Sequence, residues 1–302
     1  MILGAMGDLH HRKTSPKLRV DNYPETLKRK WEWALKEARK RGVEYMLLPG
    51  DVYDSHDAPY ASVIYLLKSI QKSKLSFGVV WGQHDQRYHT TKKNNTPLGV
   101  LTNTTVDALG SRPEAFLEDD GSLTHIYGMS WGEPEPKILD HSAFNVLCCH
   151  KHVYAKAEGW EGEDAVESLT MLKRTPFDLI VSGDNHKQFI QTYRKKWIIN
   201  AGSLGRAKVD QVDHFPAFYI IDTVSRKVER VEIPHEPIET VFNMEEYQNQ
   251  KDRKNELEKF TTSLKAGKRI SLNFKKNVMD ALEENGDTLS EKTKEIILEV
   301  MS

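Results

Sequence analysis

Residues 45–51 read Tyr-Met-Leu-Leu-Pro-Gly-Asp, an apolar run that stops at proline and glycine and is followed by a carboxylate. A continuous apolar run of this length is typical of a strand buried on both faces. Four other apolar stretches also end at Asp, His or Gln side chains. They lie at residues 2–10, 77–85, 144–150 and 177–186. The sequence therefore predicts five buried strands, each ending in side chains that can bind a metal.

Helices are expected between the early strands. The segment 27–38 places its apolar residues on one face, with Pro24 near its start and Gly42 at its end, which is the usual punctuation of a helix. Residues 61–73 and 161–173 are also interpreted as helices. The alternation of strands and helices predicts an α/β fold with a parallel core and right-handed crossovers.

The pattern of expected elements differs in the second half of the chain. Short strands in quick succession predict an antiparallel section that packs with the parallel one. They are expected at residues 188–194, 197–200, 217–222 and 227–233. Pro234 and Pro237 then mark a break, and the chain beyond it is charged and helix-like. We expect a catalytic domain over residues 1–237 and a small helical appendage over residues 238–302.

Composition excludes several classes of protein. The 302 residues include 38% hydrophobic and 29% charged residues, which argues against wholesale disorder. The net charge of −1 provides no global positive field, so a polyanion must be gripped locally. Cys148 and Cys149 are adjacent and close no useful loop, which favours a reducing compartment. No signal-peptide core or membrane span is evident, and we expect a cytoplasmic protein with no membrane partner.

The polar side chains at the five strand ends are expected to meet. Ligands of open α/β sheets bind beyond the carboxyl ends of the strands. Carboxylate, imidazole and amide groups without a thiolate are typical of a catalytic site for hard-to-intermediate divalent ions. So many ligands exceed the needs of one ion, and two ions are the arrangement used for phosphoryl hydrolysis. Each group alone could be an ordinary cap or hydrogen-bond anchor, but five in order are hard to explain as accidents.

The ordered motifs resemble those of a known family. Asp8-Leu9-His10, Gly50 to Asp54, Gly82 to Asp85, His150 and Gly183 to His186 look like the five motifs of the calcineurin-like metallophosphoesterase superfamily. The similarity spans residues 1–206. The first 100 residues look most like the SbcD-type DNA-repair exonuclease branch, which includes phage-encoded members that act in the host cytoplasm. The resemblance implies a two-sheet mixed β-sandwich flanked by helices.

The resemblance also implies roles for individual residues. Asp51 would bridge two divalent metal ions. One ion would be held by Asp8, His10, Asp51 and His186, and the other by Asp51, Gln83, His150 and Asp184. His84 would lie by the leaving-group oxygen as a general acid or transition-state stabiliser, and Asp85 would orient its imidazole. The nucleophile would be a metal-bound water.

Two positions depart from the family pattern. Gln83 stands where the third motif usually has Asn, and it offers the same amide oxygen on a longer stem. Asp184 stands where the fifth motif usually has His. An anionic oxygen in place of an imidazole favours Mn²⁺ or Mg²⁺ over Zn²⁺, so we expect Mn²⁺. Three aspartates against two divalent ions leave a net positive centre that would attract a phosphodiester.

Three further residues are candidates for substrate binding. Arg12 follows the first motif and could contact a phosphate, although an ordinary solvated turn explains it equally well. His152 lies two residues past His150, where a surface hydrogen bond is the alternative. Arg206 ends a segment that resembles a Gly-Ser loop of the superfamily, and a structural turn would need the same glycines.

We therefore predict a hydrolase: a dinuclear metal-dependent phosphodiesterase, specifically a DNA nuclease of the exonuclease branch. The first alternative is a phosphatase or a cyclic-nucleotide phosphodiesterase on the same metal core. The second alternative belongs to a different class, an inactive scaffold that uses the fold to bind proteins. The resemblance further implies DNA as substrate, a coiled-coil ATPase partner of the SbcC type, and a homodimer.

Overall fold

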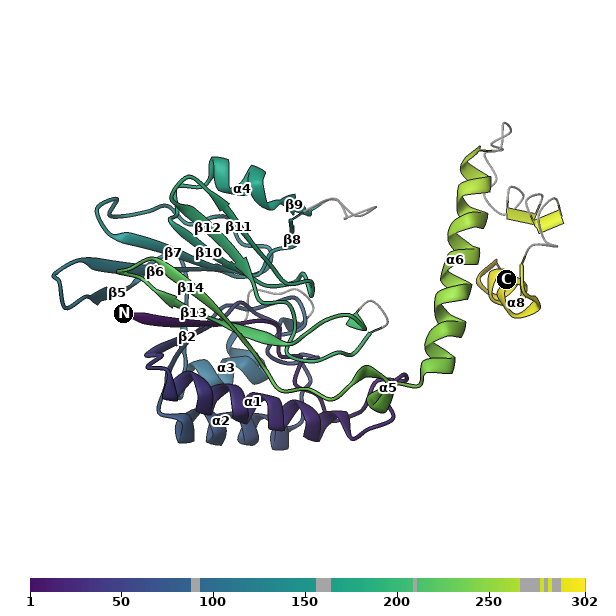
Figure 1. Cartoon of the computed structure of the whole chain (residues 1–302), viewed down its shortest axis with the longest axis horizontal. Coiled ribbons are helices and arrows are strands. Elements are labelled where there is room, and N and C mark those ends of the chain that lie inside the picture. Colours follow the sequence, from purple (N-terminus) through teal and green to yellow (C-terminus); the bar gives the residue numbers. More distant parts are fainter. Residues whose placement is uncertain are drawn as a thin grey trace. The chain divides into compact units, whose positions relative to one another are not determined.

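A computed structural model describes residues 1–87, 93–155, 164–208, 211–266, 278–279, 282–283 and 289–301. The chain divides into two compact units, Met1–Pro237 and Ile238–Ser302. Two six-stranded sheets form the body of the first unit (Figure 1). This architecture is the two-sheet mixed α/β fold that the sequence predicted.

The first sheet has the strand order β14-β13-β1-β2-β3-β4. Its strands are β1 (Ile2–Met6), β2 (Tyr45–Leu48), β3 (Ser76–Val79), β4 (Asp107–Ala108), β13 (Ala217–Asp222) and β14 (Lys227–Glu232). The four strands β1 to β4 are parallel, whereas β13 and β14 add an antiparallel pair beside β1. Of the four strands predicted as an antiparallel section, those at 217–222 and 227–233 thus join the parallel strands of this sheet, whereas those at 188–194 and 197–200 belong to the second sheet.

The second sheet has the order β11-β12-β10-β7-β6-β5. Its strands are β5 (Glu114–Leu117), β6 (Leu123–Met129), β7 (Phe144–Cys149), β10 (Leu179–Ser182), β11 (Phe189–Tyr193) and β12 (Lys196–Asn200). The central four strands are parallel, and the two edge strands β5 and β11 are antiparallel to their neighbours. In this sheet too, the carboxyl ends of the central strands therefore point to one edge.

Apolar side chains fill the space between the sheets and cover their outer faces. One buried cluster contains Leu3 and Leu47 from the first sheet together with Val146 and Cys148 from the second. Successive side chains of a strand point to opposite faces, so the neighbouring Cys149 lies in a separate cluster. Burial on both faces explains why the strands are continuous apolar runs.

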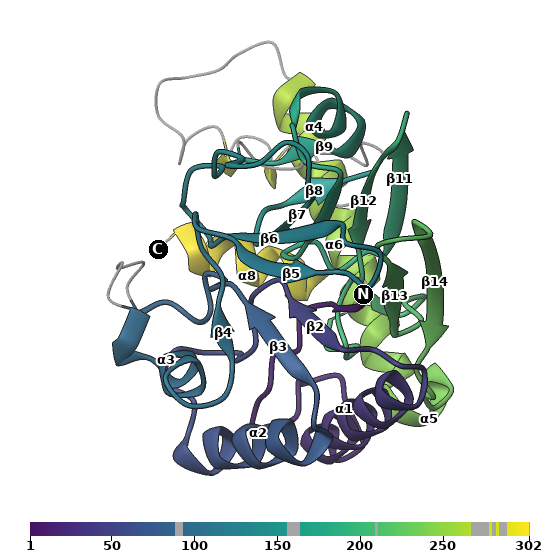
Figure 2. The same cartoon turned by 90° about the vertical axis from the view of Figure 1, so that its left-hand side faces the viewer.

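Two long helices cover the first sheet, and they lie side by side in both views (Figures 1 and 2). They are α1 (Tyr23–Lys40) and α2 (Tyr60–Ser73). Asn22 caps α1 by accepting a hydrogen bond from the Glu25 backbone N–H. The buried Trp31 of α1 donates its indole N–H to Ser69 of α2 at 2.8 Å. Two short helical segments, η2 (Lys93–Asn95) and α3 (Pro97–Thr102), lie between β3 and β4 in the sequence.

The helix predicted over residues 161–173 is wrong at its start. Val166–Glu167 forms strand β9, which pairs with β8 (Val153–Tyr154), and helix α4 covers only Ser168–Arg174. Residues 161–163 lie outside the described residues. The β-branched Val166 favours an extended backbone, and Thr170 donates its hydroxyl to Glu167 at the point where the helix begins.

The second unit contains α5 (Ile238–Val241), α6 (Met244–Ala266) and α8 (Glu291–Met301). Val278, Leu289 and Ile297 form a small buried cluster, against which Leu257 of α6 packs. Thr293 near the start of α8 donates to Glu256 of α6 at 2.9 Å. Among the described helices, none is long and apolar enough to cross a membrane.

Leu66 should carry much of the contact between α2 and the first sheet, because its side chain is 0% exposed in the cluster under that helix. Leu66→Ala removes buried methyl groups and leaves a cavity, so we expect the free energy of unfolding to fall by about 3 kcal/mol. Ile64→Ala, on the same helix at 50% exposure, should change it by less than about 0.5 kcal/mol. Urea denaturation followed by circular dichroism measures both, and equal effects would contradict this packing.

Candidate metal centre

The five strand ends meet at one rim that both sheets share. The Asp184 backbone N–H, after β10, donates to Asp8 Oδ2, after β1, at 2.9 Å. Gln83, after β3, donates its amide to Asp184 Oδ1 at 2.8 Å. His150 Nε2, after β7, lies 3.5 Å from Asp51 Oδ2, after β2. Side chains scattered over almost 180 positions of the sequence are thus brought into one polar cluster.

One part of the cluster joins Asp8, His10 and His186. The two imidazole Nε2 atoms of His10 and His186 lie 3.0 Å apart. His186 Nε2 is 3.6 Å from Asp8 Oδ2, and His10 Nε2 is 3.7 Å from Asp51 Oδ2. Each of Asp8, His10 and His186 offers a ligand atom within 4.8 Å of the others, a spacing that suits coordination of one ion.

The other part of the cluster centres on Asp51. Asp8, Asp51 and His150 also place ligand atoms within 4.8 Å of one another. His150 Nε2 lies 3.9 Å from Asp184 Oδ1, the oxygen that accepts the Gln83 amide. Asp51 contacts both parts of the cluster, so its carboxylate lies where a bridging ligand would be needed.

Buried polar atoms without partners show that the cluster fits a cation. Asp8 is 0% exposed, and its Oδ1 accepts no hydrogen bond from any described residue. The buried amide oxygen Oε1 of Gln83 likewise has no partner in the described part of the chain. Leaving such an atom unsatisfied costs about 1–3 kcal/mol, and both atoms are oxygens of the kind that bind divalent metals. The donor set therefore fits metal ions.

The backbone is strained at three of the predicted ligands. Positive φ angles occur at His10 (44°), Asp51 (46°) and Asp184 (72°). This left-handed conformation is uncommon for residues other than glycine and persists only where the surroundings enforce it. Among the six described non-glycine residues with positive φ, half are predicted metal ligands. The fold therefore bends the chain at these positions to turn their side chains into the cluster.

Two glycines allow the backbone to approach the ligands closely. A Cβ atom at Gly82 would lie 2.0 Å from Asp51 Oδ1, and one at Gly50 would lie 2.3 Å from His150 Nδ1. Gly50 also has a φ of 104°, which residues other than glycine rarely adopt. Any larger residue at Gly82 would displace the Asp51 carboxylate.

Electrostatics in the cluster favours added positive charge. Burial raises the pKa of Asp8 well above its ordinary value, and the neighbouring carboxylate of Asp51 raises it further. Burial acts to lower the pKa of His150, but the carboxylates of Asp51 and Asp8 outweigh it and raise that pKa to about 10. Burial lowers the pKa of His10 to about 3, which keeps this imidazole neutral and able to coordinate. The His150 imidazolium in turn lowers the pKa of Asp51 and of Asp184 against the effect of burial, so the cluster relies on positive charge that divalent ions can supply.

His84 lies at the rim of the cluster, with its side chain 44% exposed. Its backbone N–H donates to Asp51 Oδ1 at 3.0 Å, and its imidazole Nδ1 lies 3.0 Å from the carbonyl oxygen of Asp54. Because a carbonyl only accepts, Nδ1 carries the hydrogen of this bond. Nε2 is then the ring nitrogen on the side of Asp51, 3.9 Å from Oδ2.

The expectation that Asp85 orients the His84 imidazole is wrong. The Asp85 carboxylate is buried and accepts backbone N–H groups of Tyr53 at 3.0 Å, Gly82 at 3.1 Å and Val52 at 3.3 Å. These bonds turn the carboxylate back into the loop that follows β2. Asp85 therefore stabilises the loop that carries Asp51, and the Asp54 carbonyl is the partner of His84.

The three predicted substrate contacts differ in position. Arg12 lines a small cavity beside Asp8 and pairs with Asp54 at 3.3 Å. His152 lines a larger cavity, with Nδ1 3.7 Å from Asp184 Oδ2. The prediction that Arg206 binds substrate is wrong, because its side chain is buried and donates to the backbone carbonyl of Glu236. It lines neither cavity, so a phosphate contact by Arg206 is not supported.

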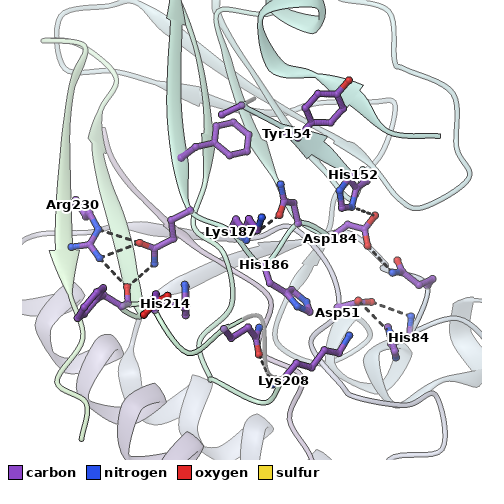
Figure 3. A pocket seen from close by; sticks show the side chains of 18 residues that line it. Asp51, His84, His152, Tyr154, Asp184, His186, Lys187, Lys208, His214 and Arg230 are labelled. Carbon is purple, nitrogen blue, oxygen red and sulfur yellow. Dashed lines mark hydrogen bonds and ion pairs between the residues drawn. The ribbon is translucent and has the colours of Figure 1, made fainter. Parts of the chain in front are cut away.

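The larger cavity, about 920 Å³, opens from the cluster toward β11 and β14 (Figure 3). Several residues that line this cavity were not predicted from the sequence. These are Tyr154, Lys187, Lys208, His214, Phe215 and Arg230. Lys208 lines both cavities, and its side chain extends toward Asp51 and His84 in Figure 3. No sequence motif includes Lys208, and only its position two residues after the candidate Arg206 could have pointed to it.

The chain has distant relatives among known proteins. The SbcD component of the SbcCD nuclease of Escherichia coli, in strains K12 and O157:H7, is 21% identical over 156 residues, which are 50% of this chain and 39% of the relative. The chain thus spans about two fifths of the length of these curated relatives.

Solved structures to which the chain shows a low similarity include one described as a novel archaeal phosphodiesterase. It is 14% identical, with a TM-score of 0.42 over 77% of this chain and 100% of that one. A single mutant of Vps29 from Entamoeba histolytica is 15% identical, with a TM-score of 0.37 over 78% and 100% of the two chains. Residues 1–226 match the calcineurin-like phosphoesterase superfamily domain. The chain belongs to the calcineurin-like phosphoesterase superfamily.

Proposed function

We propose that this phosphoesterase is a dinuclear metal-dependent phosphodiesterase that acts on DNA as a nuclease, in the manner of an exonuclease. The observation that carries the proposal is the cluster of seven side chains at the joint rim of the two sheets. One ion would be held by Asp8, His10, Asp51 and His186, and the other by Asp51, Gln83, His150 and Asp184. Such ions polarise a phosphoryl oxygen and lower the pKa of water.

The donor atoms support Mn²⁺ as the metal. Two of the proposed ligands to the second ion, Asp184 and Asp51, are carboxylates, and Gln83 adds an amide oxygen. Oxygen-rich sites of this kind favour Mn²⁺ or Mg²⁺ over Zn²⁺. The remaining imidazole, His150, suits Mn²⁺ better than Mg²⁺, which prefers oxygen ligands throughout.

His84 is the residue best placed to act on the leaving group. Its ring is the exposed imidazole at the rim, and the Asp54 carbonyl fixes its orientation. In the proposed reaction both ring nitrogens carry a hydrogen, and the Nε2–H faces the departing oxygen and gives it a hydrogen bond or its proton as the bond to phosphorus breaks, which leaves the ring neutral. Asp85 contributes indirectly by holding the loop of Asp51.

The extent of the larger cavity supports a polymeric substrate over a small phosphomonoester. Its volume of about 920 Å³ lies near the upper end of the roughly 300–1,000 Å³ typical of ligand pockets, and one phosphoryl group would occupy a small part of it. The similarity to SbcD over half of the chain supports DNA as that polymer. It also supports a coiled-coil ATPase of the SbcC type as a partner.

Metal-free protein supplied with Mn²⁺, Mg²⁺ or Zn²⁺ tests this function on four substrates: single-stranded DNA, duplex DNA, a cyclic nucleotide and an aryl phosphate. We expect turnover of DNA that is highest with Mn²⁺ and absent in EDTA. Preferential turnover of the aryl phosphate or the cyclic nucleotide would replace the nuclease by one of those activities. The absence of both metal binding and hydrolysis would indicate a scaffold.

Asp51→Asn should weaken metal binding at both sites. The carboxylate contacts both parts of the cluster, so we expect each Mn²⁺ dissociation constant to rise by at least about tenfold. Isothermal titration calorimetry measures this, with two Mn²⁺ bound by the unaltered protein. Asp119→Asn, an exposed carboxylate far along the sequence, is the control. One site that keeps its affinity in Asp51→Asn would show that Asp51 is not shared.

His84→Ala should impair turnover and leave metal binding nearly intact. Loss of a group that assists the leaving oxygen lowers kcat by about 100-fold or more, while the proposed ligands remain in place. Steady-state kinetics and the same calorimetry separate the two effects. The exposed His141→Ala should match the unaltered protein. Full activity of His84→Ala would remove His84 from the reaction.

A further inference from the structure

Phe215 is an exposed aromatic residue that lines the cavity beside the metal centre. Its side chain is 54% exposed, and the ring has one described aromatic neighbour, His235, whose ring centre lies 5.4 Å away in an edge-on contact. A phenylalanine this open gains little from folding, because most of its apolar surface stays in water. Its position in the cavity wall suggests that a ligand covers it.

The backbone of Phe215 is firmly held. Its carbonyl oxygen accepts hydrogen bonds from Gln188 Nε2 at 2.9 Å and from Arg230 Nη2 at 2.8 Å. Arg230 also donates to the Gln188 side chain at 3.0 Å, and Figure 3 shows these contacts at the end of the cavity away from Asp51 and His84. Pro216 follows and restricts the backbone further. A ring presented on a fixed backbone binds a ligand with little loss of entropy.

The same cavity combines aromatic and cationic side chains. Phe189 and Tyr154 line it together with Phe215, and three cations accompany them. The cations are Lys187, Lys208 and Arg230. Proteins that bind single-stranded nucleic acid typically combine aromatic side chains, which stack on the bases, with cations that contact the phosphate backbone.

We propose that Phe215 forms a base-stacking subsite, which receives an unpaired nucleobase of a strand whose phosphodiester lies at the metal centre. Lys208 lines the same cavity, and its side chain extends toward Asp51 and His84 (Figure 3), so it contacts a backbone phosphate of the bound strand near the metal centre. In a duplex both faces of an internal base are already stacked, so the subsite selects single strands or frayed ends. This inference rests on the proposed phosphodiesterase function and names its substrate class.

The test compares Phe215→Ala, Phe215→Trp and Tyr60→Ala in the full chain. Tyr60 is the matched control, because it is an aromatic residue at 87% exposure outside the cavity. Binding of a fluorescein-labelled, cleavage-resistant phosphorothioate 12-mer is measured by anisotropy in Mn²⁺. Hydrolysis of bis(p-nitrophenyl) phosphate, a diester with no nucleobase, measures the metal centre separately.

Phe215→Ala should raise the dissociation constant of the single strand by about tenfold, within the range for loss of one stacked base. Its effect on the small diester should be several-fold smaller, Phe215→Trp should restore binding, and Tyr60→Ala should match the unaltered protein. Unchanged binding in Phe215→Ala, or equal losses for strand and diester, would overturn the subsite. Failure of the unaltered protein to hydrolyse both DNA and the small diester with any metal would instead overturn the proposed function, and the binding measurement would still decide the subsite.

Discussion

The buried carboxylate of Asp51 is the point at which the two sheets are joined electrostatically. It is 1% exposed, accepts the His84 backbone N–H at 3.0 Å, and lies within 3.9 Å of the imidazoles of His10, His84 and His150. Carboxylates taken out of water are costly unless positive charge compensates them. The arrangement therefore needs cations, and the surrounding structure is built to keep the donors together.

The surroundings of Asp51 show how the fold meets that requirement. A left-handed backbone turns Asp51 inward, and Gly82 leaves the space that its carboxylate occupies. Asp85 secures the following loop through three backbone N–H groups. Each device has a local cost in strain or burial, which the packed sheets on both sides offset. Backbone strain of this kind is typical of functional sites, where the positions of side chains matter more than local stability.

The cavity extends the site beyond the metal cluster. The proposed ligands follow the ends of parallel strands. Arg230 comes from β14, whereas Phe215 lies just before β13 and Gln188 just before β11. The two regions meet because β13 and β14 lie beside β1. Within one fold, the parallel strands thus hold the reactive groups and the antiparallel additions shape what can reach them.

The sequence alone determined the strands that end in polar residues, the α/β class, the family and the group of polar residues at the strand ends, but it missed β4, β5, β6, β8 and β9. Those features are local, because apolar runs, glycines and short motifs are written in consecutive residues. The sequence also misassigned Asp85 and Arg206, whose side chains turn away from the site to bind backbone groups. Only the tertiary structure decided those directions, and only it placed Lys208, Phe215 and Arg230 on the cavity wall. A side chain's partner depends on segments far away in the chain, and no local pattern encodes which of several loops will lie against it.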